Sequence, residues 1–222
     1  MCGRMIVLTY DEVLQVVQAM SAGPDNPYPD WPARAPIDAY PQDDVPIVGA
    51  LPGVGDASTG RELGTPVRLL RWGYPVEWQA GPVFNTRIES IASGRGMWRE
   101  SFEKGRCLVP TRGFFERHGT QKVRSAKTGR LVKRQYAFEL VDEPITWLAG
   151  ISEGDHFSVV TTDPNGFVAP VHERMPVVLR REELPLWMAG ELGALADRSD
   201  VELIVKPEGQ EADEEGEQLS LF

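Results

Sequence analysis

The chain has 222 residues, 41% of them hydrophobic, and a formal net charge of −10, which is the composition of a soluble globular protein with its own core. Its two cysteines, Cys2 and Cys107, are too few for a disulfide framework, and no metal-ligand spacing is present, so we expect no metal and no cofactor. Neither a signal sequence nor a run of about 20 apolar residues opens or crosses the chain, so we expect a cytoplasmic protein without membrane contact.

The first predicted element is a helix over residues 10–21. Thr9 and Glu12 form the pattern of a capping box, and apolar residues follow at helical spacing. Residues 22–66 are rich in Pro and Gly, and we expect a long loop region with a short strand at 46–48. A strand over 67–72, a short helix near 96–104 and strands at 106–110 and 114–115 come next.

The second half of the chain predicts further short strands at 135–141, 145–149, 157–162, 176–179 and 201–205, with a helix from 182 that extends in pieces to 195. Many short strands with few helices do not fit a regular βαβ alternation. We therefore expect an α+β fold, a single domain over residues 1–206 with a curved, mostly antiparallel, barrel-like sheet.

Charge is spread unevenly along the chain. Residues 207–222 hold six acidic residues and no basic one, so residues 1–206 alone carry only −4. Such a tail is expected to be disordered. Eight basic residues against the single acid Glu116 lie between Arg112 and Arg134. This basic segment is either a solvated hairpin or a surface that faces phosphate groups.

The second residue is a cysteine, and we expect Met1 to be removed because the next side chain is small. An N-terminal cysteine carries an amine and a thiol with reference pKa values of roughly 8 and about 8.5. The amine can condense with an aldehyde to an imine, and the thiol can then close a five-membered thiazolidine. Cys107, within an apolar segment, is instead expected to be a buried residue.

Several separated motifs occur in an order that resembles the SRAP family (SOS response-associated peptidase), whose members crosslink to abasic sites in single-stranded DNA. The motifs are Cys-Gly-Arg at 2–4, Arg-Trp-Gly at 71–73, Asn-Thr-Arg-Ile-Glu at 85–89, Cys-Leu-Val-Pro-Thr-Arg-Gly-Phe-Phe-Glu at 107–116, Thr-Thr at 161–162 and His-Glu-Arg-Met-Pro at 172–176. The chain departs from the family at Asp38, where Asn is usual, and at Arg117, where Trp is usual.

The resemblance implies a catalytic set of Cys2, Asn85, Glu116 and His172. Glu116, beside two phenylalanines, would have a raised pKa and could donate a proton to the sugar or its carbonyl. His172 could move protons during imine formation and its reversal, and Asn85 could hold the Cys2 amine or thiol without adding charge.

The same resemblance implies DNA contacts by Arg4, Trp72, Arg87 and Thr161. The two arginines would bind flanking phosphates, and Trp72 would stack on a base beside the lesion. If residues 85–89 are extended, Asn85, Arg87 and Glu89 share one face.

The chain ends Gln218-Leu219-Ser220-Leu221-Phe222, which is similar to the peptide by which bacterial repair proteins bind the β sliding clamp. Leu219, Leu221 and Phe222 could fill an apolar pocket while Gln218 fixes the orientation. A chance match, or a strand that folds back on the domain, is the alternative.

The leading interpretation is a monomeric abasic-site sensor of the DNA damage and SOS response, with lyase activity where the imine eliminates before the thiol closes. It would act in the cytoplasm, on the nucleoid when bound to DNA. Two alternatives stay open: an N-terminal-cysteine peptidase or amidohydrolase that also removes its own Met1, and a non-covalent module that binds DNA or the clamp.

Overall fold

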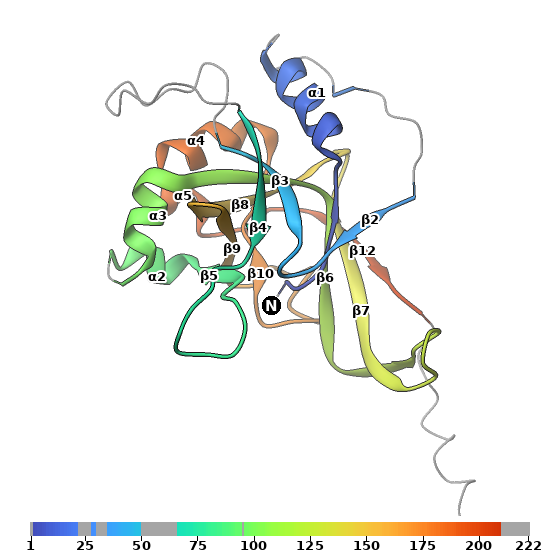
Figure 1. Cartoon of the computed structure of the whole chain (residues 1–222). Helices are drawn as coiled ribbons and strands as arrows, with labels where there is room; N and C mark the ends of the chain where they lie inside the picture. The colour runs from blue at the N-terminus through green and yellow to red at the C-terminus, as the bar shows by residue number, and fades with distance from the viewer. Residues whose placement is uncertain (1, 22–27, 30–34, 50–65, 95, 210–222) are drawn as a thin grey trace, which may run out of the picture.

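The N-terminal segment forms a short strand before the predicted helix. In the computed structural model, which describes residues 2–21, 28–29, 35–49, 66–94 and 96–209, strand β1 (Met5–Val7) pairs antiparallel with the long strand β6 (Arg106–Arg124) (Figure 1). Helix α1 (Tyr10–Ser21) follows. The Thr9 backbone N–H donates to Oε2 of Glu12 at 2.8 Å, and the Glu12 N–H donates to Oγ1 of Thr9 at 3.2 Å. The predicted capping box is therefore confirmed.

Five strands close into a barrel, and this confirms the predicted α+β fold with a curved, mostly antiparallel sheet. Around the ring, β3 (Asp44–Val48) lies between β4 (Val67–Trp72) and β6, and β8 (Thr146–Glu153) lies between β6 and β9 (His156–Thr162). Strands β4 and β9 complete the ring as a parallel pair, and the other four pairings are antiparallel.

Shorter elements surround the barrel. The additional strands are β2 (Ile37–Ala39), β5 (Asn85–Arg87), β7 (Leu131–Leu140), β10 (Met175–Pro176), β11 (Val178–Leu179) and β12 (Leu203–Pro207). The remaining helices are α2 (Ile88–Ala92), α3 (Trp98–Gly105), the 3₁₀ turn η1 (Arg181–Glu183), α4 (Leu184–Ala189) and α5 (Leu192–Leu195). The strand expected at 176–179 is in fact two strands, because β10 pairs with β9 and β11 pairs with β8.

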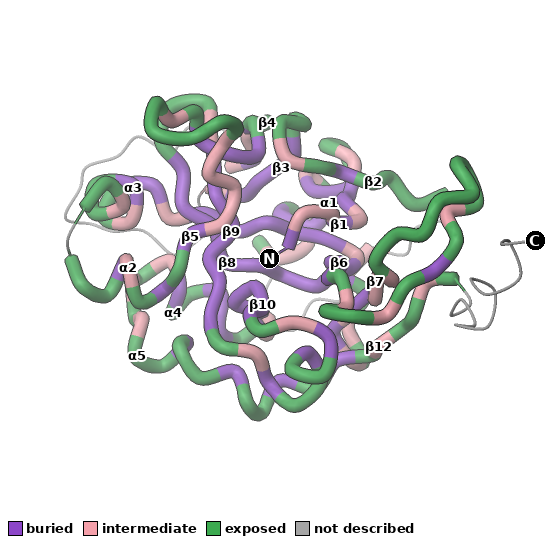
Figure 2. Tube along the Cα trace, turned by 90° about the horizontal axis from the view of Figure 1, so that it is seen from below, coloured by how far each residue is buried: buried purple, intermediate pink, exposed green. Residues whose placement is uncertain are grey.

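Apolar residues fill both sides of the barrel wall. One cluster includes Cys2, Trp72, Phe114 and Phe138, and a second packs the wall against α1 and α4. Figure 2 shows buried strands around the N-terminus. The strands pack closely at Gly113, where an added Cβ would lie 2.7 Å from the Phe138 carbonyl oxygen. A side chain at position 113 would therefore push β6 and β7 apart.

Within the described residues, no helix combines the length and the apolar character needed to cross a membrane. Strand β12 ends at Pro207, and the described chain ends at Gly209. Most of the acidic tail predicted from residue 207, including Gln218, Leu219, Leu221 and Phe222, lies outside the described residues. The boundary between domain and tail therefore stays a prediction.

Candidate active site

The pairing of β1 with β6 fixes Cys2 inside the protein. The Phe115 backbone N–H donates to the Arg4 carbonyl oxygen at 3.0 Å, and the residues just before β1 then turn inward. Cys2 is fully buried in the core cluster, and its Sγ lies 3.6 Å from the Arg4 carbonyl oxygen. Burial, followed by the negative charge of Glu116, raises the pKa of the Cys2 thiol far above its ordinary value. The thiol is therefore neutral at physiological pH.

Asn85 reaches Cys2 from β5, which lies parallel to β9. Its Nδ2 donates to the Cys2 carbonyl oxygen at 2.8 Å. Its Oδ1 is buried and accepts no hydrogen bond from the described residues. An unpaired buried acceptor costs about 1–3 kcal/mol, so this oxygen is suited to a donor on an incoming ligand.

Glu116 and His172 face each other beside Cys2. Oε2 of Glu116 lies 3.9 Å from Nε2 of His172, and only 2% of the Glu116 surface is exposed. Burial raises the pKa of Glu116 to about 7, as its position beside two phenylalanines predicts. Burial also lowers the pKa of the half-buried His172. A partly protonated acid thus faces a neutral imidazole near neutral pH.

The backbone of Arg174 supports either protonation state of the His172 ring. Its N–H donates to Nδ1 at 3.1 Å, which favours the neutral tautomer with the proton on Nε2, toward Glu116. Its carbonyl oxygen also lies 3.1 Å from Nδ1, where a protonated ring could donate. The ring can therefore gain and lose a proton without moving, which is what acid–base catalysis requires.

The Arg174 side chain joins two of the motifs, and the sequence reasoning missed it. The guanidinium binds both carboxylate oxygens of Glu89 at 2.9 Å, Asp163 at 2.6 Å and the Thr161 carbonyl oxygen at 3.0 Å. The condition under which Glu89 would share one face with Asn85 and Arg87 is not met, because the strand ends at Arg87 and helix α2 begins at Ile88. The signal available in the sequence was a carboxylate in one motif, Glu89, and an arginine in another, Arg174, which together could have predicted an ion pair.

Two of the residues expected to contact DNA are buried in this structure. Trp72 is fully buried, its Nε1–H donates to the Phe84 carbonyl oxygen at 2.9 Å, and its ring contacts Phe84 and Phe157. Thr161 is 1% exposed, and its hydroxyl donates to the Thr86 carbonyl oxygen. Both side chains are about as buried as Cys2, so the structure shows packing contacts for them, and their expected contacts with DNA stay predictions.

The two arginines that were expected to bind phosphate, Arg4 and Arg87, differ in how free their side chains are to do so. Arg4 stacks on the Phe115 ring at 3.9 Å and donates to Asp38 at 3.0 Å, to Glu208 at 2.6 Å and to Gln135 at 3.2 Å. A phosphate would have to displace a carboxylate from it. Arg87 is exposed and forms no hydrogen bond or ion pair through its side chain with the described part of the chain. Arg87 is therefore the more available of the two.

Four elements thus converge on one buried cysteine. The N-terminus brings Cys2, β5 brings the amide of Asn85, β6 brings the acid Glu116, and the segment before β10 brings the imidazole of His172. The site thus combines a thiol, a carboxyl with a raised pKa, a neutral imidazole and an unused amide oxygen. Cys107, by contrast, is fully buried in the barrel wall, and burial raises the pKa of its thiol to about 12.

Several known proteins are similar to this chain in sequence. The chain is 28% identical to the abasic site processing protein YedK of Escherichia coli over 130 residues, a match that spans 54% of either protein. It is 24% identical to the abasic site processing protein YoaM of Bacillus subtilis over 203 residues, which cover 85% of this chain and 79% of YoaM.

Solved structures share the fold of this chain. A phage-related protein of Bordetella bronchiseptica matches 94% of this chain and 95% of its own with a TM-score of 0.62 and 20% identity. A protein of Bacteroides thetaiotaomicron matches 76% of each chain with a TM-score of 0.54. The family model of the SOS response associated peptidases matches residues 1–214, and the chain therefore belongs to the SRAP family.

Proposed function

We propose that this protein captures the ring-opened aldehyde of an abasic site in single-stranded DNA as a thiazolidine on Cys2, after removal of Met1. The observation that carries the proposal is the pairing of Glu116 with His172, 3.9 Å apart, around a buried N-terminal cysteine. The names of the relatives, which are abasic site processing proteins, support the same substrate.

The chemistry has two bond-forming steps. The Cys2 amine adds to the sugar aldehyde, and loss of water gives an imine. Glu116, with a pKa of about 7, donates the proton that turns the hydroxyl into a leaving water. The thiol then adds to the imine carbon, and its proton passes to the nitrogen through His172. Each step is reversible, so the same residues can release the DNA. Elimination from the imine before the thiol adds would cut the strand instead.

The raised pKa of the Cys2 thiol favours this chemistry over peptide hydrolysis. A cysteine peptidase attacks as a thiolate, which requires a lowered thiol pKa. Burial here has the opposite effect. Capture of an aldehyde instead begins with attack by the uncharged amine. The thiol adds afterwards to the imine carbon, and it can lose its proton as the carbon–sulfur bond forms.

A denaturing gel tests the proposal with single-stranded DNA that holds one abasic site. We expect a covalent shift with the wild type, none with Cys2→Ala, and full adduct with Cys107→Ala as the matched control. Protein that retains Met1, verified by mass spectrometry, should also fail because its amine is blocked. Glu116→Gln should slow capture about a hundredfold, the usual contribution of a general acid. Absence of adduct with the wild type would refute the proposal.

A further inference from the structure

The β6–β7 hairpin extends beyond the barrel as a two-stranded arm. Strand β12 pairs with β7 only as far as Pro207 opposite Tyr136, and Glu208 donates its N–H to the Gln135 carbonyl oxygen at the end of that pairing. Beyond this point, β6 and β7 pair with each other through Lys122–Lys133 to Arg124–Leu131. Figure 1 shows the arm projecting away from the barrel, and Figure 2 shows that most of it is exposed.

One face of the arm concentrates positive charge. Residues directly opposite each other in a sheet point to the same side. Lys122 lies opposite Lys133, Arg117 lies opposite Gln135, and Arg124 lies two residues from Lys122 on the same side. We call these four cations, Arg117, Lys122, Arg124 and Lys133, the basic face. Like charges placed directly opposite each other destabilise a free hairpin, so this pairing has no folding advantage.

The basic face is not neutralised within the described chain. None of its four side chains forms a hydrogen bond or an ion pair with the residues that the structure describes. Some exposed cations elsewhere do have acidic partners: Lys104 binds Glu100 at 2.8 Å, and Lys206 binds Glu139 at 2.6 Å. In a chain with a net charge of −10, four adjacent cations without a partner among the described residues favour a polyanionic partner.

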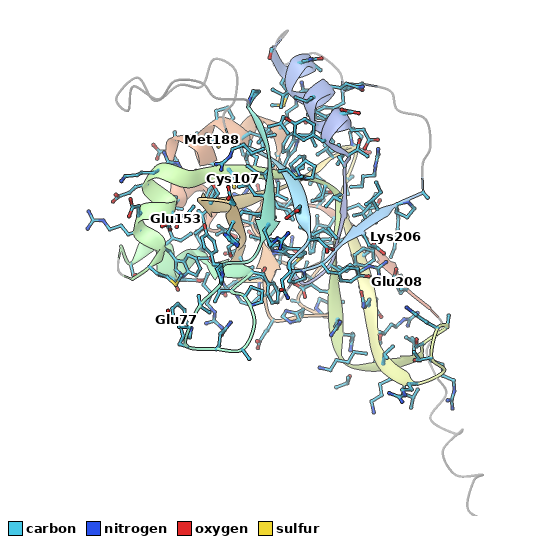
Figure 3. All side chains as sticks on the ribbon, in the orientation of Figure 1. Glu77, Cys107, Glu153, Met188, Lys206 and Glu208 are labelled. Atoms are coloured by element: carbon cyan, nitrogen blue, oxygen red, sulfur yellow. The ribbon has the colours of Figure 1, made fainter. Side chains whose placement is uncertain are left out.

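The basic face also adjoins the active site. Arg117 directly follows Glu116, so the two side chains point to opposite sides of the hairpin, but the charges of Arg117 and Lys133 still act on Glu116 and His172 respectively. Gln135, on the same side of the hairpin, accepts a hydrogen bond from Arg4. A strand held at the site could therefore continue along this face. In Figure 3, Glu208 marks the point where the arm leaves the barrel.

We propose that the basic face binds the phosphate backbone of the DNA that flanks the captured lesion. The inference rests on the proposed function for the nature of the partner, and it assigns the hairpin a task separate from the chemistry at Cys2. Phosphate contacts hold and orient a nucleic acid without reading its sequence, and this suits a protein whose lesion can occur anywhere.

Equilibrium binding at several salt concentrations tests the inference on the full chain. The probes are an unmodified single strand and an unmodified duplex, so that adduct formation plays no part. The variant Lys122→Gln/Arg124→Gln/Lys133→Gln removes three cations. If all three contact phosphates, the slope of log K against log salt should fall in magnitude by about 2 on single strands or almost 3 on duplex. The probe that shows the loss identifies the form of DNA that the face binds.

A matched control removes three cations that have their own acidic partners, as Arg99→Gln/Lys104→Gln/Lys206→Gln. It should keep the wild-type slope, and thermal unfolding should show that both variants are folded. Wild-type slopes on both probes for the hairpin variant would overturn the inference. Tighter DNA binding by that variant would also overturn the inference. The basic face would then bind acidic residues of this chain rather than the phosphates of DNA. The gel assay with the wild type tests the proposed function independently.

Discussion

Glu116 illustrates how one buried carboxyl can link catalysis to stability. The carboxyl is almost completely buried, and burial raises its pKa from an ordinary 4.5 to about 7. The protein keeps an acid in a place where a charge is costly, and it can do so because the protonated form is neutral. The same property that makes Glu116 a proton donor near pH 7 must therefore make folding depend on pH.

We expect Glu116→Gln to remove a pH-dependent part of the stability. In the wild type, the folded carboxyl holds its proton above the pH at which the unfolded one loses it. The contribution is complete below about pH 4.5 and is lost as the pH rises through about 7, an effect of ~3 kcal/mol. The amide that replaces the carboxyl cannot titrate, so the variant should gain stability relative to the wild type across that range. Urea unfolding at several pH values measures this, and parallel curves for the two proteins would contradict it.

Individual residues differ in how well the sequence predicts their place. Burial of Cys107 and a raised pKa of Glu116 could be predicted because apolar neighbours surround both in the sequence. The burial of Trp72 was harder to predict, because it lies between Arg71 and Gly73 in the sequence and still points into the barrel. The capture of Arg4 by Glu208 depends on residues 204 positions apart, and no local pattern contains that information.

Elements defined by local signals were the more predictable ones. Helix α1 begins with its capping box and strand β4 was expected over 67–72, and both occur where predicted. The closure of the barrel through β6 and β8, and the parallel pair of β4 and β9, are non-local and were not predicted. The helix α2 directly after Arg87 was missed because its five residues are too few to show a helical period.

Arg174, which lies just before β10, links helix α2 to strand β9, and its loss should destabilise the fold. Its guanidinium, almost fully buried, connects Glu89 of α2 with Asp163 and with the carbonyl oxygen of Thr161 in β9. Arg174→Gln would leave several hydrogen-bonding partners unsatisfied, and we expect a loss of about 2–3 kcal/mol in the free energy of unfolding. Urea denaturation measures this. Arg87→Gln, an exposed residue, is the control and should change stability by less than about 0.5 kcal/mol; an equal loss in both would contradict the assignment.

At the scale of the whole molecule, the two ends of the described chain meet. Arg4, two residues after the reactive cysteine, donates to Glu208, just after the last strand. The Arg134 guanidinium donates to the Gly209 carbonyl oxygen at 2.8 Å and holds the same segment against β7. The acidic segment that follows therefore begins beside the site, next to the basic hairpin. A partner of the end of the chain would therefore be brought close to the proposed DNA-binding face.

The sequence at residues 218–222 leads to the proposal that this partner is the β sliding clamp. At about 3.3 Å per extended residue, the stretch from Gly209 to Gln218 could reach roughly 30 Å from the point where Arg134 holds Gly209. Leu221→Ala/Phe222→Ala should weaken binding to purified clamp about thirtyfold or more, because buried apolar anchors carry most of such an interface. Ser220→Ala, between the anchors, is the control and should bind as the wild type does. Because neither variant changes a residue of the proposed catalytic set, both should still capture an abasic site, and equal clamp binding by the wild type and the double variant would refute the proposal.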